Sequence, residues 1–142
     1  MTILYIGLAG VVGALMRYGF GLLLVPYDTT ELFPLATLLI NYSGCFGLAW
    51  LLYSPLARSR LSERFRTVIG TGVIGSYTTF SAFSAETVLL LDRQAWGAAI
   101  AYIVLSAAGG YLFAWLGERI ALRRTSIGSE KVADKGTDRG RP

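Results

Sequence analysis

The sequence has no histidine, a single cysteine and few charged residues. Charged side chains make up 15% of the 142 residues, whereas 54% are hydrophobic. Without histidine, and with Cys45 as the only thiol, the chain offers neither a zinc cluster nor a Cys-His nucleophile. Cys45 lies between Gly44 and Phe46 in an apolar run and is expected to serve packing alone. We therefore do not expect an enzyme.

Long apolar runs fill most of the chain and leave no room for a soluble catalytic domain. A membrane-spanning helix needs roughly 20 apolar residues. Four stretches qualify, at about 3–25, 33–54, 67–91 and 95–117. The sequence therefore predicts an all-α integral membrane protein, in which residues 1–120 form a four-helix membrane domain.

The two ends of the chain differ in composition. The first apolar stretch has no basic residues before it, so we expect it to remain as a helix and not to be cleaved as a signal peptide. Residues 121–142 are polar and of mixed charge, which is typical of a disordered tail in water. We assign this tail no function.

Arginines are distributed very unevenly around the predicted spans. Arg93 is the only one in the connection between the last two spans, whereas the other side of the membrane would carry seven. Short loops rich in arginine face the cytoplasm, so we expect both termini to be cytoplasmic in the plasma membrane. The basic balance reflects this asymmetry, and a nucleic-acid partner is not expected. The seven are Arg58, Arg60, Arg64, Arg66, Arg119, Arg123 and Arg124.

The segment GSYTTFSAF, residues 75–83, interrupts the third apolar stretch with residues that are poor helix formers. We predict a helix break at 75–79. A break at membrane depth frees backbone carbonyls, which need partners in protein, water or a bound cation. Phe80 and Phe83 follow three residues apart, on one helix face. They serve either packing or, through the positive edges of their rings, the binding of a small anion.

Three polar side chains elsewhere in the spans need an explanation, and two of them allow two interpretations. Asn41 forms either an interhelical hydrogen bond or, with Thr79, Ser81 and Ser84, a set of neutral donors along an anion path. Arg17 either extends its side chain to the membrane surface or faces water or a partner. Glu86 reads as a carboxylate near the membrane boundary.

Small residues and hydroxyls mark the faces of the first and last spans. Gly7, Gly10, Gly13 and Ala14 predict a close helix contact in the first. In the last, Tyr102 and Ser106 share a face, and the row continues as Gly110 and Ala114 without hydroxyls.

The segments GALMRY, TLLINYSGCFG and GSYTTFSAFSAE, in this order, resemble the fluoride-specific ion channel family, Fluc or CrcB. The resemblance covers roughly residues 3–118 and implies an antiparallel dimer of four-helix subunits with two fluoride pores and a central structural sodium ion. By resemblance, the backbone carbonyls of Gly75 and Thr78 hold the sodium, and Arg17 and Glu86 match the family's arginine and acidic residue. The pore or anion path would include Asn41, Thr79, Phe80, Ser81, Phe83, Ser84, Tyr102 and Ser106.

The chain departs from the family pattern at four positions. Ser76 stands where glycine is more usual, and Ala82, Gly110 and Ala114 stand where hydroxyl-bearing residues are common. A homodimer, the family default, needs subunits that insert in both orientations and hence balanced loop charge. The arginine bias therefore favours a homologous partner subunit of opposite orientation. Two alternatives stay open: a non-conducting partner subunit, and a small proton-coupled multidrug-type transporter, which would be expected to carry an acidic residue in its first helix.

Overall fold

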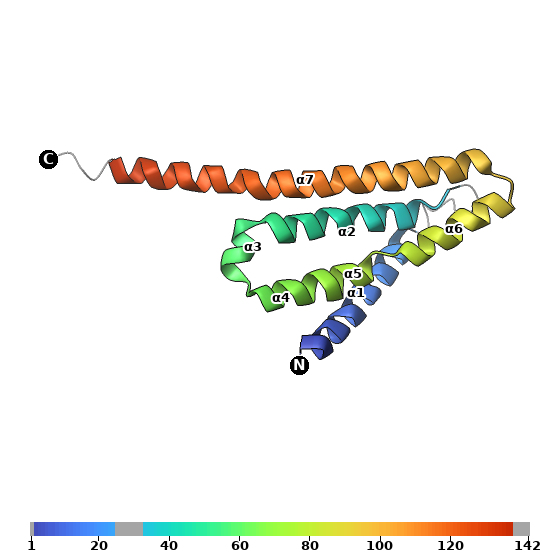
Figure 1. The fold of residues 1–142 in the computed structure, drawn as a ribbon, viewed down its shortest axis with the longest axis horizontal. Helices are drawn as coiled ribbons and strands as arrows, with labels where there is room; N and C mark the ends of the chain where they lie inside the picture. Colours follow the sequence, from blue (N-terminus) through green and yellow to red (C-terminus); the bar gives the residue numbers. More distant parts are fainter. Residues whose placement is uncertain (1, 25–32, 138–142) are drawn as a thin grey trace.

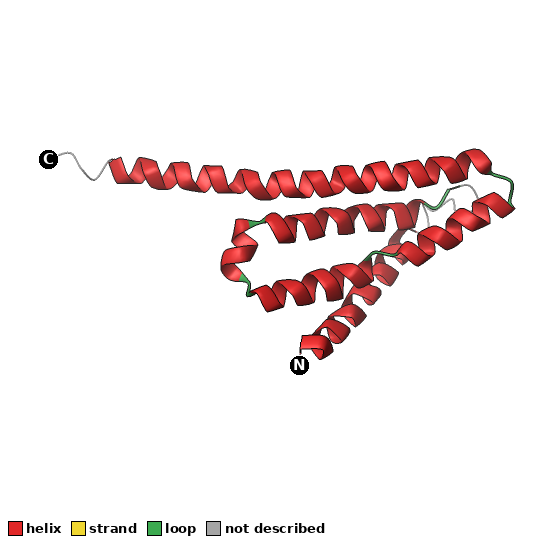
Figure 2. Ribbon diagram, viewed as in Figure 1, coloured by secondary structure: helices red, strands yellow, loops and turns green. Residues whose placement is uncertain are grey.

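The computed structural model describes the backbone of residues 2–24 and 33–137, and the side chains of these residues as far as Arg123. All described elements are helices, joined by short connections (Figure 2). The expected end of the first span at residue 25, and residues 138–142 of the expected tail, lie outside the described residues. The elements are α1 (Thr2–Leu24), α2 (Leu35–Tyr53), α3 (Pro55–Arg60), α4 (Glu63–Thr67), the π-helical segment η2 (Val68–Ile74), α5 (Gly75–Tyr77), α6 (Phe80–Asp92) and α7 (Trp96–Thr137).

Helices α2 and α7 lie side by side, and the chain returns from α2 through α3 into the α4–α6 run. Helix α1 crosses behind this run at η2 and α5 (Figure 1). Three described helices are long and apolar enough to cross a membrane: Thr2–Leu24, Leu35–Tyr53 and Trp96–Arg123. The third expected span, at 67–91, is divided into shorter helical segments and is therefore not among these three. The chain is thus an all-helical membrane protein, while a four-span topology stays a prediction.

Helix α7 continues to Thr137, well past residue 117, where the last span was expected to end. Residues 121–142 were expected to form a tail without regular structure, whereas the backbone is helical as far as Thr137. An established helix gains one hydrogen bond for each residue that it adds, and no proline interrupts residues 118–137. The division of the chain at residue 120 stays a prediction.

Glycines bring α1 against η2, as the small residues of the first span predict. A methyl group added at Gly13 would lie 2.0 Å from the carbonyl oxygen of Val73, so the two backbones are in direct contact. Gly10 faces the Ser76 hydroxyl, whereas nothing lies within 4 Å of a methyl group added at Gly7. The predicted contact is therefore confirmed for Gly10 and Gly13 and not for Gly7.

We expect Gly13→Ala to destabilise the protein by about 1–3 kcal/mol, because an added methyl group forces two packed backbones apart. Gly7→Ala is the matched control, since its methyl group would meet open space. Thermal unfolding of both variants in detergent measures the difference. Equal midpoints for the two variants would contradict the described contact.

A buried cluster joins α2, α6 and α7 near the start of α7. Leu38, Leu90, Ala99 and Tyr102 form its centre, and Tyr102 is completely buried. Most of the surface of α1 is apolar and exposed, as are Ile100 and Val104 of α7. Large exposed apolar faces of this kind are expected where helices contact lipid or another subunit.

Candidate functional site

The run from η2 to α6 breaks at Thr78 and Thr79, visible in Figure 2 as a loop in the middle of a helical rod. Both residues are extended, with ψ 159° at Thr78, and φ −148° and ψ 123° at Thr79. The Thr79 hydroxyl then caps α6 by accepting the Ala82 N–H at 3.1 Å. The predicted break is confirmed at Thr78 and Thr79, whereas Gly75–Tyr77, also included in the predicted range, are helical. The π-helical segment before it was not predicted.

Asn41, from the middle of α2, holds this break with both ends of its amide. Its Nδ2 donates to the Thr79 carbonyl at 3.0 Å, and its Oδ1 accepts the Thr79 N–H at 2.8 Å. The interpretation of Asn41 as an interhelical hydrogen-bonding residue is confirmed. One Nδ2 hydrogen is left over from this pair, so a role as a donor to an anion stays a prediction.

The same contacts release two backbone carbonyls from helical hydrogen bonding. In an uninterrupted helix, the Thr79 N–H would bond to the Gly75 carbonyl and the Ala82 N–H to the Thr78 carbonyl. Here the Thr79 N–H goes to Asn41 Oδ1 and the Ala82 N–H to Thr79 Oγ1. Side-chain oxygens therefore replace the Gly75 and Thr78 carbonyls as acceptors, and both carbonyls are available to another partner.

These carbonyls suit a cation that prefers oxygen ligands. Unwound backbone at membrane depth coordinates sodium in other membrane proteins through such carbonyls. Within the described residues there is no group of three or more His, Cys, Asp or Glu side chains that could hold a metal. The Gly75 and Thr78 carbonyls thus fit the sodium that the resemblance implies.

An open groove of about 460 Å³ runs along the break, between α2 and α7. It brings together seven predicted site residues from three parts of the chain. Their neighbours are apolar or small, and none of the described residues that line the groove is charged. The lining residues are Asn41, Gly44, Cys45, Leu48, Ile74, Gly75, Thr78, Thr79, Phe80, Phe83, Ile103, Ser106, Ala107 and Gly110.

Phe80 and Phe83 line this groove at the start of α6. Their ring centroids are 5.7 Å apart and the rings are inclined by 43°. Phe83 also packs against Tyr102 at 5.2 Å, whereas 79% of Phe80 is exposed. Phe83 is thus anchored by packing, while Phe80 has no comparable support among the described residues.

The predicted hydroxyls of α6 bond locally and do not line the groove. Ser81 lies 3.2 Å from the Thr79 hydroxyl, and Ser84 donates to the Phe80 carbonyl of its own helix at 3.0 Å. From α7, Ser106 lines the groove, as does Gly110 one turn further on. Their roles along an anion path stay predictions.

Glu86 belongs to a separate polar cluster that the sequence analysis missed. Its two carboxylate oxygens accept the hydroxyls of Thr37 and Tyr102, each at 2.6 Å. Thr37 and Tyr102 are buried, so three helices meet at one half-buried carboxylate. Neither Tyr102 nor Glu86 lines the groove. Thr37 had no signal in its spacing, because its partner lies 49 positions away.

Arg17 lies on α1 and is not brought together with the other predicted site residues. Its side chain is half-buried and does not line the groove. Its predicted role therefore rests on the resemblance alone.

We expect Asn41→Ala to lower the free energy of unfolding by about 1–3 kcal/mol, because it leaves the buried Thr79 N–H without its acceptor. Ser59→Ala is the matched control, since the Ser59 hydroxyl bonds only to the Leu56 carbonyl of its own short helix. Thermal unfolding in detergent compares the two. A loss in Asn41→Ala no larger than in Ser59→Ala would argue against this clamp.

Comparison with known proteins places these features in a family. Residues 4–118 match the family model described as CrcB-like protein, Camphor Resistance (CrcB). "Fluoride-specific ion channel FluC 1" of Bacillus thuringiensis subsp. konkukian is 48% identical over 112 residues, which cover 79% of this chain and 81% of the relative. "Fluoride-specific ion channel FluC 2" of Geobacillus kaustophilus is 42% identical over 130 residues, covering 90% and 100%. A protein of the same name from Listeria monocytogenes serotype 4b is 38% identical over 133 residues, covering 94% and 100%. The chain belongs to the CrcB-like protein family.

Proposed function

We propose that this chain is a subunit of a fluoride-selective ion channel that exports cytoplasmic fluoride passively and so reduces its toxicity. The names of its relatives support this function. The observation that carries it is the groove beside the helix break, which is lined without any charged side chain and bears Asn41, Thr79, Phe80 and Ser106. Neutral donors and ring edges suit an anion that must be released as readily as it is bound.

The pore would be completed by a second subunit, because the groove of one subunit is open. Phe80 is an apolar side chain with 79% of its surface exposed beside the groove. Burial of such a surface is favourable at about 25 cal/mol per Å². A second subunit that covers Phe80 would therefore both stabilise the assembly and enclose a path for the anion.

The sodium ion would also be bound by both subunits together. Gly75 and Thr78 offer one carbonyl each, which is too few oxygens for a hard cation. A twofold axis beside the break would double this set, since a twofold interface presents the same patch from both subunits. If that axis lies in the membrane plane, the two subunits are antiparallel, and a structural sodium would lie at the centre of the dimer. When bound, sodium would supply positive charge that holds the two breaks together.

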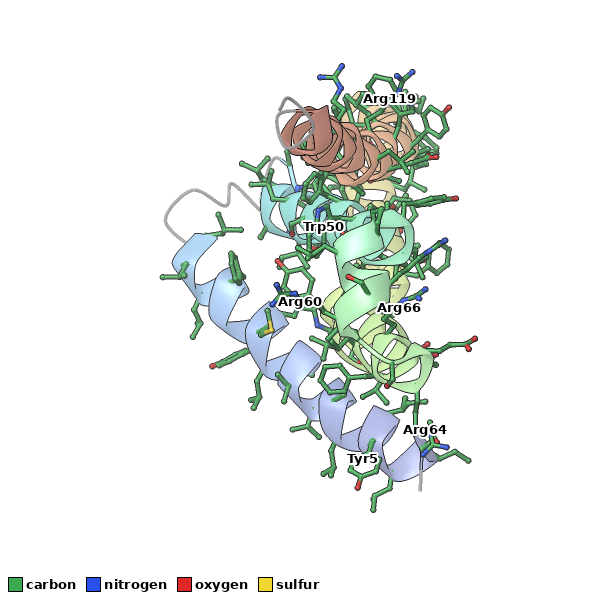
Figure 3. All side chains as sticks on the ribbon, turned by 90° about the vertical axis from the view of Figure 1, so that its left-hand side faces the viewer. Tyr5, Trp50, Arg60, Arg64, Arg66 and Arg119 are labelled. Carbon is green, nitrogen blue, oxygen red and sulfur yellow. The ribbon has the colours of Figure 1, made fainter. Side chains whose placement is uncertain are left out.

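The charge distribution supports insertion in a single orientation. Figure 3 views the end of the bundle that carries α3 and shows Arg60, Arg64, Arg66 and Arg119 there. Arg93 follows α6, at the other end of the α6 helix from the break. By the positive-inside rule the arginine-rich end, and with it both termini, would be cytoplasmic in the plasma membrane. The partner would then be a homologous subunit of opposite orientation.

Labelling of tags at the two termini in intact cells tests this orientation. We expect both tags to be protected from a membrane-impermeant reagent and to react only after the cells are opened. Equal exposure of the tags on the two faces of the membrane, seen as partial labelling in intact cells that increases when the cells are opened, would overturn the single orientation and favour a homodimer.

A second candidate function is a non-conducting partner subunit. Gly110 lines the groove one turn after Ser106, so the hydroxyl row on α7 ends inside the groove. A subunit of this kind would complete a pore formed mainly by its partner. A small multidrug-type transporter is not favoured by any observation, since α1 carries no acidic residue.

Growth of a bacterium that lacks its own fluoride exporter tests the proposed function. We expect expression of this chain together with an oppositely oriented homologue to restore growth in fluoride. Unchanged sensitivity, with both proteins present in the membrane, would contradict the proposal. Rescue by the homologue alone, with no further gain from this chain, would contradict both candidates, because each requires this chain to complete the pore.

A further inference from the structure

One face of α7 carries a second groove, distant in sequence from the helix break and facing away from α2. It encloses about 520 Å³ and is lined by Trp115, Glu118, Arg119, Leu122 and Arg123. These residues are three or four positions apart and therefore lie on one side of the helix. Trp115 follows a strongly apolar stretch of α7, and the charged residues Glu118, Arg119 and Arg123 come directly after it.

Apolar and cationic side chains lie next to one another on this face. The guanidinium of Arg119 lies 5.0 Å from the centre of the Trp115 ring, over its face. Trp115 and Leu122 are exposed, by 40% and 47%. Tryptophan is enriched at the membrane surface, where its apolar body contacts lipid and its N–H contacts headgroups. This face is therefore built for the boundary between acyl chains and headgroups.

The net charge of the groove matches a single negative charge. The residues that line it carry two positive charges, on Arg119 and Arg123, and one negative charge, on Glu118. A phospholipid phosphodiester carries one negative charge, and guanidinium groups bind phosphate through paired hydrogen bonds.

The neighbouring elements add positive charge at the same end of the bundle. Helix α3 contacts α7, and the α3 and α4 segments bring Arg60 and Arg64 to this end (Figure 3). Leu56 of α3 and Phe65 of α4 are exposed as well, as expected of short helices that lie in a membrane surface. Basic clusters directly beside a membrane span attract anionic lipids.

We propose that the face of α7 formed by Trp115, Arg119, Leu122 and Arg123 binds the phosphate group of an anionic phospholipid in the adjoining leaflet. The guanidinium groups of Arg119 and Arg123 hold the phosphate, and Trp115 and Leu122 contact the glycerol and the upper acyl chains. The bound lipid fixes the depth of α7 in the membrane at its arginine-rich end.

Quenching of Trp115 fluorescence by brominated lipid tests this site without any measurement of ion flux. The full chain with Trp50→Phe and Trp96→Phe retains Trp115 as its only tryptophan. In nanodiscs we expect brominated phosphatidylglycerol to associate about fivefold more strongly than brominated phosphatidylcholine, the preference expected of one additional basic contact. Arg119→Gln should remove the preference, and Arg93→Gln, at the other end of α6, should keep it. Equal quenching by the two lipids, or a preference that survives Arg119→Gln, would overturn the proposal.

A second measurement uses the unsubstituted protein, in case the tryptophan variants fold poorly. We expect phosphatidylglycerol added to the protein in detergent to raise the midpoint of thermal unfolding more than phosphatidylcholine does. Inorganic phosphate at equal ionic strength should not reproduce this rise. An equal rise with both lipids would contradict the site, and an equal rise with inorganic phosphate would overturn the assignment to a lipid.

Discussion

Phe80→Ile is expected to reduce fluoride efflux from liposomes by about 10- to 100-fold, the factor that corresponds to a loss of roughly 1–3 kcal/mol along the path. Isoleucine keeps an apolar side chain at the groove but has no aromatic ring. The substitution therefore removes the positive ring edge that would face the anion. Because 79% of Phe80 is exposed in the subunit, little packing inside the subunit is lost with the ring.

Phe65→Ile is the matched control for this substitution. Phe65 is also an exposed phenylalanine, at 52%, but it lies on α4 and does not line the groove. Its substitution should leave efflux unchanged. Initial rates of fluoride loss, normalised to the amount of dimer, compare the two variants. Undiminished efflux in Phe80→Ile would exclude an essential aromatic edge at this position.

Removal of sodium is expected to weaken the dimer and to reduce fluoride efflux at least about tenfold. The Gly75 and Thr78 carbonyls lose their helical donors to Asn41 and Thr79. In the proposed dimer, they would therefore lie unpaired near the axis when no cation is bound. A ligand that binds only the assembled form stabilises it by about 2.7 kcal/mol when its concentration is 100 times its dissociation constant. Loss of that ligand shifts the dimer equilibrium by about 100-fold.

The experiment replaces sodium with N-methylglucamine throughout purification and reconstitution, with chloride as the common anion. Size-exclusion chromatography reports the fraction of dimer, and a fluoride electrode reports efflux. Return of sodium should restore both quantities. If neither the dimer fraction nor the efflux rate depends on sodium, the proposed structural sodium site is contradicted.

The helix break was predictable because its signal is local. Glycine and adjacent threonines in a membrane span weaken the helix at that place, whatever surrounds it, and the break appears at Thr78 and Thr79. The close approach of α1 at Gly10 and Gly13 was predictable for a similar reason, since small residues permit contact between backbones.

The cluster around Glu86 was not predictable, because it depends on tertiary pairing. The hydroxyls of Thr37 and Tyr102 reach one carboxylate from two other helices, and no sequence spacing encodes such a meeting. The double hydrogen bond of Asn41 to Thr79 shows an intermediate case: the need for a partner was predictable, whereas the identity of that partner was not.

The continuation of α7 to Thr137 was missed because composition and helix growth point in opposite directions. The polar residues after 121 favour disorder on average, but a long membrane helix supplies the nucleus from which they continue. The π-helical η2 was missed because Gly70 and Gly72 mark a weak helix without specifying its hydrogen-bond pattern.

Fluoride efflux from liposomes, with chloride efflux as the control, tests the central claim most directly. The purified chain is reconstituted alone and together with an oppositely oriented homologue, and a fluoride electrode records the loss of internal fluoride. We predict rapid fluoride loss without chloride loss from the mixed preparation, and little flux from the chain alone. No fluoride flux from either preparation, with both proteins folded and inserted, or equal loss of both anions, would contradict the claim that this chain forms part of a fluoride channel.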